Sequence, residues 1–240
     1  MRMLLLLIVG LLPVAAAAMT VTPRAPGGIF VAGKRLTFDL GNAKGTVTYT
    51  LTDYFGGEVA KGSLQGAEID LPAVKPGWYL LTCVDEAGSI EVPIGVVMDR
   101  HGAALPEHGR VCADAASAWL IRKEAYRKPF ARMIRLAGIP WLRERLSWPE
   151  TEREPGKIDW RHYQAVADTL AAEGIRICQV FHQTPGWAAS PAPDQMRPRD
   201  LRDLYRYIRT ASSHFRKQIP AWEVWNEMDI DFWTGLADSF

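Results

Sequence analysis

Residues 222–227, with the sequence Trp-Glu-Val-Trp-Asn-Glu, end in a pair of side chains that could carry out acid–base chemistry. The aromatic and aliphatic residues of this segment indicate a buried strand, and Asn226 and Glu227 stand where that strand would meet a polar loop. A half-desolvated glutamate beside a second carboxylate has a raised pKa and can serve as a general acid. Cleavage of a glycosidic bond needs such an acid, together with a carboxylate on the opposite face of the sugar ring. Glu227 is therefore the candidate proton donor, and Asn226 is the candidate to hydrogen-bond the sugar 2-hydroxyl. A solvated strand end without function would show the same pair.

The elements that would position this pair alternate between strand and helix. We expect strands at residues 111–113, 139–143, 175–181 and 222–225. We expect helices at residues 122–137, from Asp159 to Gly174, and across the apolar period at residues 201–219. Such alternation predicts a parallel sheet in a barrel or a doubly wound fold. The first strand is not followed by a G-x-G-x-x-G motif, which disfavours the nucleotide-binding version. Long loops follow the second and third strands, at the edge where a barrel builds its active site.

The region before residue 98 has a different pattern of short β-rich runs. Runs rich in β-branched and aromatic residues alternate with Gly-Gly, Pro-Gly and Ala-Gly pairs. The expected strands are at 29–31, 35–39, 46–52, 59–63, 79–84 and 90–94. This pattern predicts a small antiparallel β-sandwich over residues 19–98, then a linker at 99–110 and the α/β domain at 111–240. We interpret the sandwich as an accessory domain, with a carbohydrate-binding module as the alternative.

Four motifs in this order resemble clan A glycoside hydrolases, especially those of families 39 and 5. The segment at 222–227 is similar to the fourth-strand motif of these enzymes. The other three motifs are Gly-Ile-Pro-Trp-Leu-Arg-Glu-Arg-Leu-Ser-Trp at 138–148, Glu-Pro-Gly-Lys-Ile-Asp-Trp at 154–160 and Gln-Val-Phe-His-Gln-Thr-Pro-Gly-Trp-Ala at 179–188. The resemblance covers about residues 110–235. It implies a (β/α)8 barrel and a retaining double displacement, in which Glu227 is the acid and later the base.

The resemblance also implies roles for residues on the second and third strands. Arg143 matches the second-strand arginine that holds the nucleophile's carboxylate in this clan, although a purely structural salt bridge, for instance to Glu223, would use it equally well. Alternation along the strand places Glu223 on the same side as Glu227 but one layer deeper, so we interpret Glu223 as structural. His182 ends the third strand and is a candidate substrate contact or a core histidine. Two tryptophans, Trp187 and Trp148, are candidates for stacking on a sugar or for loop packing.

The region after the linker is shorter than a whole barrel requires. A (β/α)8 barrel takes about 250 residues, whereas positions 111–240 hold only enough for four strands. By the resemblance, the nucleophile is a glutamate on the seventh strand and would lie beyond residue 240. The nucleophile cannot be replaced by Asp229, Asp231 or Asp238, because these residues are too close in sequence to Glu227. We therefore expect a truncated barrel, a fragment that is inactive alone.

Three functions are considered for the whole protein on the basis of its sequence. The leading hypothesis is hydrolysis of O-glycosidic bonds in a poly- or oligosaccharide, and the alternative is a non-catalytic carbohydrate-binding protein. A metal-dependent hydrolase is disfavoured, because only His182 of the five histidines stands at an expected strand end. We expect a carbohydrate partner, no cofactor and no metal.

The net charge disfavours two classes of partner, and the cysteine spacing disfavours a metal site. The chain has 28 basic and 27 acidic residues, and removal of a leader containing Arg2 leaves 27 of each. A neutral chain gives no electrostatic reason to expect a nucleic acid or an anionic membrane. The three cysteines, Cys83, Cys112 and Cys178, have no metal-type spacing. One disulfide would be compatible with export, but mostly buried thiols are expected.

The amino terminus is typical of an export signal. Arg2 precedes the apolar run 3–12, and small residues follow at 15–18. This order predicts a signal peptide over residues 1–18, cleaved after Ala18, and a secreted or periplasmic protein without stable membrane contact after cleavage. An uncleaved signal anchor is the alternative, since the run is near the lower limit for a membrane span.

Overall fold

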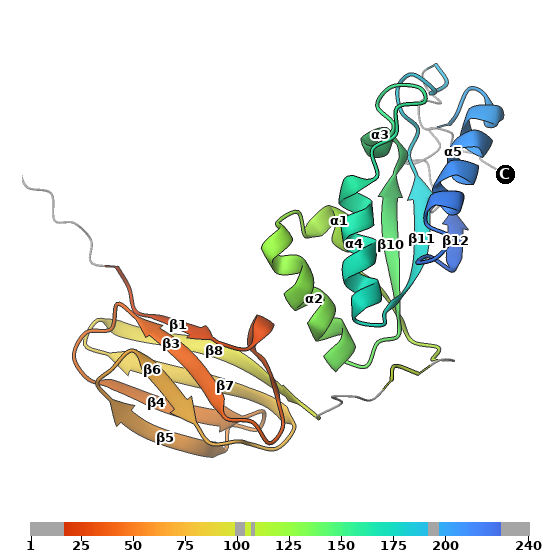
Figure 1. The fold of residues 1–240 in the computed structure, drawn as a ribbon. Helices are drawn as coiled ribbons and strands as arrows, with labels where there is room; N and C mark the ends of the chain where they lie inside the picture. The colour runs from red at the N-terminus through yellow and green to blue at the C-terminus, as the bar shows by residue number, and fades with distance from the viewer. Residues whose placement is uncertain (1–16, 99–103, 107–108, 192–196, 227–240) are drawn as a thin grey trace, which may run out of the picture. The chain divides into compact units, whose positions relative to one another are not determined.

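The computed structural model describes residues 17–98, 104–106, 109–191 and 197–226. The chain divides into two compact units, residues 1–96 and 97–240, and each is described by itself. The first unit contains β-strands and one short 3-10 turn, whereas strands alternate with helices in the second (Figure 1). The expected leader lies outside the described residues except for Ala17 and Ala18, and so does part of the expected linker. No helix within the described ranges is long and apolar enough to cross a membrane.

Two sheets form the first unit. The three-stranded sheet has the spatial order β1 (Thr20–Pro23), β3 (Leu36–Gly41) and β6 (Glu68–Leu71). The five-stranded sheet has the order β2 (Ile29–Val31), β8 (Gly88–Val97), β7 (Gly77–Asp85), β4 (Val47–Asp53) and β5 (Glu58–Leu64). The 3-10 turn Pro26–Gly28 precedes β2. Strands β1 and β6 were not expected from the sequence, because β1 ends in a proline and β6 carries two acidic residues, types that are depleted in strands.

Alternation of apolar residues explains why these strands form. Leu36, Phe38 and Leu40 of β3 are buried on one side of the strand. Leu51 of β4 and Leu81 of β7 belong to the same core cluster. Because β3 is in one sheet and β4 and β7 are in the other, the two sheets share one hydrophobic core.

Four parallel strands form the sheet of the second unit, in the order in which they occur in the chain (Figure 1). They are β9 (Cys112–Asp114), β10 (Trp141–Ser147), β11 (Arg176–His182) and β12 (Ala221–Val224). The helices between them are α1 (Ser117–Leu120), α2 (Glu124–Leu136), α3 (Trp148–Thr151), α4 (Arg161–Ala172) and α5 (Leu201–His214). The predicted alternation of strands and helices is confirmed, and the fold is mixed α/β.

The helices form where the apolar period indicated, with two corrections at their ends. The buried face of α4 carries Tyr163, Val166, Ala167 and Leu170, as predicted. The N-cap of α4 is Trp160 rather than Asp159, although Asp159 Oδ1 accepts a hydrogen bond from the backbone N–H of Arg161 at 3.0 Å. Helix α5 ends at His214 instead of continuing to Ile219. Ile219 is nevertheless buried in the same core, which accounts for the longer apolar pattern.

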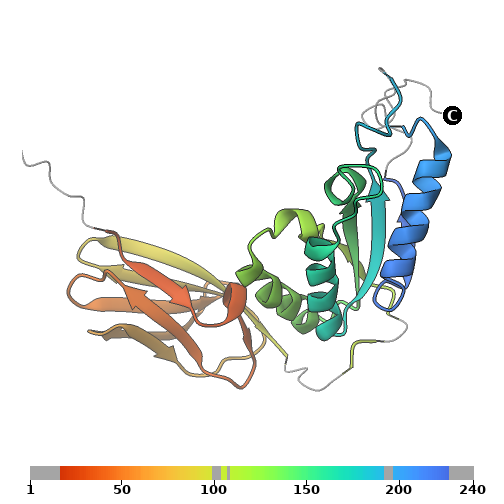
Figure 2. The same ribbon diagram turned by 45° about the horizontal axis from the view of Figure 1, so that its top comes forward.

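The two faces of the parallel sheet carry different side chains, because successive residues of a strand point to opposite sides. Leu142 and Leu146 of β10 and Ile177 and Phe181 of β11 belong to the core cluster that includes the buried residues of α4 and α5. Figure 2 shows α4 and α5 flanking β11. The opposite side, here named the polar face, is defined by Asp114 of β9, Arg143 and Arg145 of β10, and Glu223 of β12.

Candidate active site

The carboxyl ends of β9 to β12 meet at one edge of the sheet, because the strands are parallel. In register, Arg143 pairs with Asp114 on one side and with Cys178 on the other, while Glu223 pairs with Val180. This register brings residues from three strands together on the polar face next to the edge. It is the edge at which barrel enzymes bind their substrates.

Arg143 is the centre of the polar face. Its Nε donates to Glu223 Oε2 at 2.7 Å and its Nη2 donates to Glu223 Oε1, so the pair is bidentate. The same Nη2 donates to Asn226 Oδ1 at 2.8 Å, and Nη1 donates to Asp114 Oδ2 at 2.7 Å. The hydrogen bonds from Arg143 lower the pKa of the Glu223 carboxyl, and the same bonds raise the pKa of Arg143. Arg143 is therefore a fixed cation whose three partners come from β9, β12 and the residues after β12.

Asp114 and Arg145 belong to the same network and were not predicted from the sequence. Arg145 Nη2 donates to Asp114 Oδ2 at 2.7 Å. Burial raises the pKa of Asp114, but the hydrogen bonds from Arg145 and Arg143 outweigh it, and the net pKa is lowered. Arg145 Nη1 is buried and has no hydrogen-bond partner among the described residues. The signal that could have found this network is the two-residue spacing of Arg143 and Arg145, which places both on one side of a strand.

The backbone is strained at three points along this edge. Ala116, Gln183 and Trp225 have φ values of 45°, 69° and 68°, and they follow β9, β11 and β12. A left-handed backbone costs a residue with a side chain on the order of 1 kcal/mol, and such residues cluster at functional sites. The backbone N–H of Trp225 donates to the carbonyl of Phe181 at 2.9 Å, which holds this turn against β11. The turn leads directly to Asn226, whose side chain accepts from Arg143.

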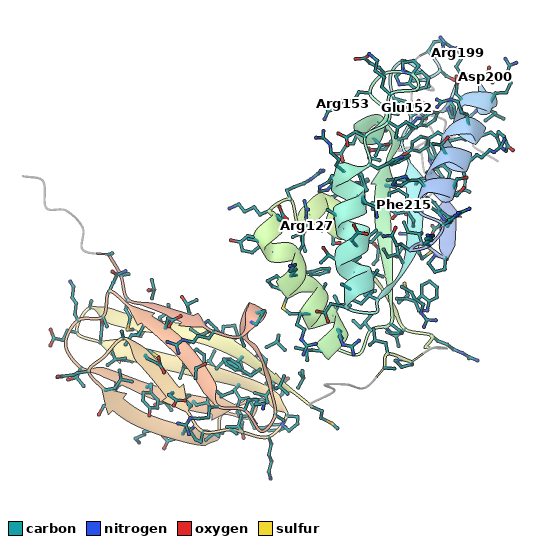
Figure 3. The ribbon with its side chains drawn as sticks, in the orientation of Figure 1. Arg127, Glu152, Arg153, Arg199, Asp200 and Phe215 are labelled. Atoms are coloured by element: carbon teal, nitrogen blue, oxygen red, sulfur yellow. The ribbon has the colours of Figure 1, made fainter. Side chains whose placement is uncertain are left out.

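A buried carboxylate ties the loops at this edge together. Glu152 is wholly buried, and its carboxylate accepts from Trp148 Nε1 at 2.7 Å, from the backbone N–H of Gly156 at 2.6 Å and from Arg206 Nη2 at 2.7 Å. Its backbone carbonyl accepts from Trp187 Nε1 at 3.0 Å. Figure 3 shows Glu152 at the same end of the unit as Arg199 and Asp200, toward the arrowheads of β10 and β11. The side chain of Glu152 thus connects the loop after β10 to α5. Its backbone carbonyl connects the same loop to the loop after β11.

The structure contradicts the expectation that Trp148 stacks on a sugar. Its side chain is wholly buried, and its ring stacks on Tyr207 with centroids 5.0 Å apart and planes at 16°. Trp187 contacts it edge to face at 5.8 Å. Because its ring is covered by protein and its Nε1 is bound to Glu152, Trp148 is a core residue.

Three further predicted site residues are Trp187, His182 and Glu227. Trp187 is half-buried, and the guanidinium of Arg206 lies 5.9 Å from its ring centroid, so loop packing accounts for the contacts described and its role toward a sugar stays a prediction. His182 ends β11, in register with Ser147. Glu227 lies outside the described residues, directly after Asn226. Of the predicted site residues, the structure therefore joins Arg143 to Asn226 and Trp187 to Trp148.

A resident metal is not indicated by the described residues, because none of their His, Cys, Asp and Glu side chains form a group of three or more that could hold one. The cysteines are free thiols, and Cys112 is exposed rather than buried as expected. Cys112 and Cys178 stand on β9 and β11, two strands apart. The separation is about 10 Å at the usual strand spacing, which is too far for a disulfide without backbone movement.

Comparisons with known proteins show the fold. No family model matches the chain, and no curated protein matches it. A family 39 glycoside hydrolase from the gut symbiont Bacteroides cellulosilyticus WH2 is similar in structure, with a TM-score of 0.67 and 21% identity. The alignment covers 87% of this chain and 44% of that one.

Two further matches have lower scores and carry no weight in the fold assignment. An exo-β-1,4-mannosidase from Opitutaceae bacterium strain TAV5 has 17% identity and a TM-score of 0.41, over 50% of this chain and 25% of that one. A β-galactosidase from Marinomonas ef1 has 15% identity and a TM-score of 0.39, over 49% and 22%. Over most of its length the chain therefore has the fold of the matching part of the family 39 structure, and it spans less than half the length of that structure.

Proposed function

We propose that the chain contributes the amino-terminal βα units of a retaining glycoside hydrolase barrel and that Glu227 is its general acid/base. The observation that carries the proposal is the hydrogen bond from Arg143 to Asn226 at the carboxyl edge of the parallel sheet. It fixes the residue beside Glu227 to the polar face of β10, at the end of a sheet similar to that of the family 39 structure. The proposed substrate class is a poly- or oligosaccharide with O-glycosidic bonds. The chain spans 44% of the family 39 structure, so the activity is proposed for a protein that contains the whole barrel.

Asn226 would bind the sugar through its amide nitrogen. Its Oδ1 accepts from Arg143 Nη2, so the Nδ2 group is the part left to donate to a hydroxyl. In a glycosidase, a hydrogen bond to the sugar 2-hydroxyl strengthens in the transition state. The role of Arg143 toward Asn226 is to orient the amide so that Nδ2 is presented to the sugar.

Glu227 would act twice in the reaction. It first protonates the glycosidic oxygen as a second carboxylate attacks the anomeric carbon, and the leaving group departs with that proton. It then takes a proton from water, which attacks the glycosyl-enzyme and releases the sugar and the nucleophile. The charges of the polar face itself balance, because the two positive charges of Arg143 and Arg145 are paired with those of Asp114 and Glu223.

The test is replacement of Glu227 with Ala in the complete enzyme. We expect a loss of roughly 10²–10⁴-fold on an unactivated glycoside, because general acid–base help has about that value. An aryl glycoside with a good leaving group needs little protonation, so its first step should be much less affected. Azide, which needs no base, should then restore turnover of that substrate. The matched control is Glu91→Gln, an exposed glutamate of the first unit, which should keep full activity. Near-normal activity of Glu227→Ala on the unactivated glycoside would exclude the assignment.

We also propose that the protein is exported through a leader at residues 1–18. The basic residue, apolar run and small-residue exit of the sequence support this. Amino-terminal sequencing of the protein from its host should begin near Met19. An intact leader recovered in the membrane fraction would favour the anchor instead.

A further inference from the structure

An exposed group of aromatic side chains on the first unit has no part in the chemistry proposed above. Tyr54 and Phe55 lie in the turn between β4 and β5, and Trp78 lies near the start of β7. Their exposed fractions are 72%, 91% and 45%. These three residues are named the aromatic cluster. Single exposed apolar residues are common on proteins, but a contiguous group usually marks a binding surface.

The three rings are adjacent because of the register of the sheet. Asp53 of β4 pairs with Tyr79 of β7, which sets Tyr54 beside Trp78. The rings of Tyr54 and Trp78 meet edge to face, with centroids 6.1 Å apart and planes at 84°. Those of Tyr54 and Phe55 do the same at 5.4 Å and 88°. Tyr54 therefore braces a ring on each side, while most of each surface of Tyr54 and Phe55 stays open to solvent.

The turn that presents these rings is ordered by its own hydrogen bonds. Asp53 Oδ1 accepts from the backbone N–H groups of Phe55 and Gly57 at 2.9 and 2.8 Å. The backbone N–H of Gly56 donates to the carbonyl of Asp53 at 3.0 Å, and Gly56 has a φ of 83° that favours glycine. A turn held in this way exposes Phe55 without folding it back onto the sheet, and it reduces the ordering cost of binding.

The charged side chains beside the aromatic cluster interact with other groups of the same unit. Asp53 is occupied by the turn, and Glu58 forms an ion pair with Lys61 at 3.4 Å. Because Asp53 is bonded to backbone donors and Glu58 is paired with Lys61, the aromatic faces are the groups that this surface offers, which suits an uncharged ligand. The C–H faces of sugar rings are uncharged and apolar, and they stack on aromatic rings of this kind.

The size of the cluster also argues against a protein partner. Three aromatic side chains at these exposures present on the order of 400 Å². A stable protein interface takes about 800 Å² from each partner. An area of half that size is enough to cover a few sugar units but not enough to hold a second copy of the chain.

We propose that the aromatic cluster is a binding site for a neutral glycan chain, separate from the catalytic edge. The inference rests on the proposed function only for the class of ligand. A site of this kind would hold the unit on a polysaccharide whether or not a bond is being cleaved, so it is tested by binding and without hydrolysis.

The experiment is affinity electrophoresis of the full chain in gels that contain mixed-linkage β-glucan, arabinoxylan or galactomannan. We expect at least one of these neutral polysaccharides to retard the chain, and a gel with anionic polygalacturonate to retard it less. The variant Tyr54→Ala/Phe55→Ala/Trp78→Ala should raise the Kd at least about tenfold, as truncation of central aromatic contacts typically does. The control Tyr126→Ala, an exposed tyrosine of α2, should be retarded like the unaltered chain.

The single variant Phe55→Ala keeps the test decisive if the triple variant does not fold, because this side chain is almost wholly exposed. It should weaken binding while circular dichroism stays unchanged. Absence of retardation by all three neutral polysaccharides would overturn the proposal, and so would equal retardation of the triple variant. A dimer in size-exclusion chromatography that the triple variant converts to a monomer would assign the cluster to self-association instead. Failure of the Glu227 experiment would leave each of these outcomes unchanged.

Discussion

Arg143 on β10 and Glu223 on β12 meet across the intervening strand β11. The guanidinium contacts both carboxylate oxygens of Glu223, and it also reaches Asp114 and Asn226. Two strands that share no backbone hydrogen bonds are thereby joined on the polar face.

The Arg143–Glu223 pair should stabilise the second unit modestly. Arg143→Ala removes the hydrogen bonds to Glu223, Asp114 and Asn226 and leaves Glu223 without this cation, while Asp114 keeps Arg145, so we expect a loss of about 1–2 kcal/mol in the free energy of unfolding. Glu223→Gln should cost less, since its side chain is partly exposed and water can replace the contact. A double-mutant cycle followed by urea unfolding measures the coupling between them. Tryptophan fluorescence suits it, because Trp78 is the only one of the nine tryptophans in the first unit. A coupling energy of zero would contradict the expectation that this pair stabilises the second unit.

The stability of the second unit should fall in acid more steeply with Glu223 than without it. Hydrogen bonds from Arg143 lower the pKa of this carboxyl in the folded state, whereas a glutamate in the unfolded chain has a pKa of about 4.3. The contribution is therefore complete above pH of about 4.3 and is lost as the pH falls through the folded-state pKa. The difference in free energy of unfolding between the unaltered chain and Glu223→Gln should shrink between pH 6 and pH 3. A constant difference over that range would show that the carboxylate is not stabilised by its charge.

Glu152→Ala should be the most destabilising of these changes. It removes a buried carboxylate and leaves Trp148 Nε1, the Gly156 N–H and Arg206 without an acceptor. We expect a loss of about 3 kcal/mol, the lower end for a broken buried pair, because Arg206 is partly exposed and can turn to water. Thermal and urea unfolding check this. Glu154→Ala is the matched control, since its ion pair with Lys157 is exposed, and it should change stability by no more than about 0.5 kcal/mol.

The three cysteines should differ in reactivity toward a thiol reagent at pH 8.5. Cys83 is wholly buried, and burial raises its pKa to about 11, so it should react only after unfolding. Cys112 is exposed and should react in the folded chain, although burial of part of its thiol and the nearby Asp114 raise its pKa. Mass spectrometry after labelling identifies the sites. Loss of one thiol pair as a disulfide in the folded chain would contradict the separation of Cys112 and Cys178.

Much of the local structure followed from the sequence, because it depends on the period of apolar residues. The buried face of α4 could be named residue by residue, and β11 was indicated by a nearly continuous apolar run. Strands β1 and β6 could not be found in this way, since the proline of β1 and the two acidic residues of β6 are types that are depleted in strands.

Less of the candidate site could be predicted, and the tryptophans show why. Trp148 begins α3 and Trp187 stands in the loop after β11, and both were candidates for sugar stacking. The side chain of Trp148 is buried against Tyr207 and bound to Glu152, while that of Trp187 is half-buried. The residue type is the same in both cases, so only the packing around each ring distinguishes a core residue from a surface residue.

Asn226 and Glu227 could be singled out from the sequence because they follow an apolar run, and Arg143 through the resemblance to the second-strand motif. Which side chains meet depends on the tertiary structure. Arg143 and Glu223 are 80 residues apart, and their contact depends on the register of β10, β11 and β12. The left-handed backbone of Trp225 then sets the position of Asn226. Register and backbone turns of this kind arise from the packing of the whole sheet, because a one-residue shift would move every side chain to the other face.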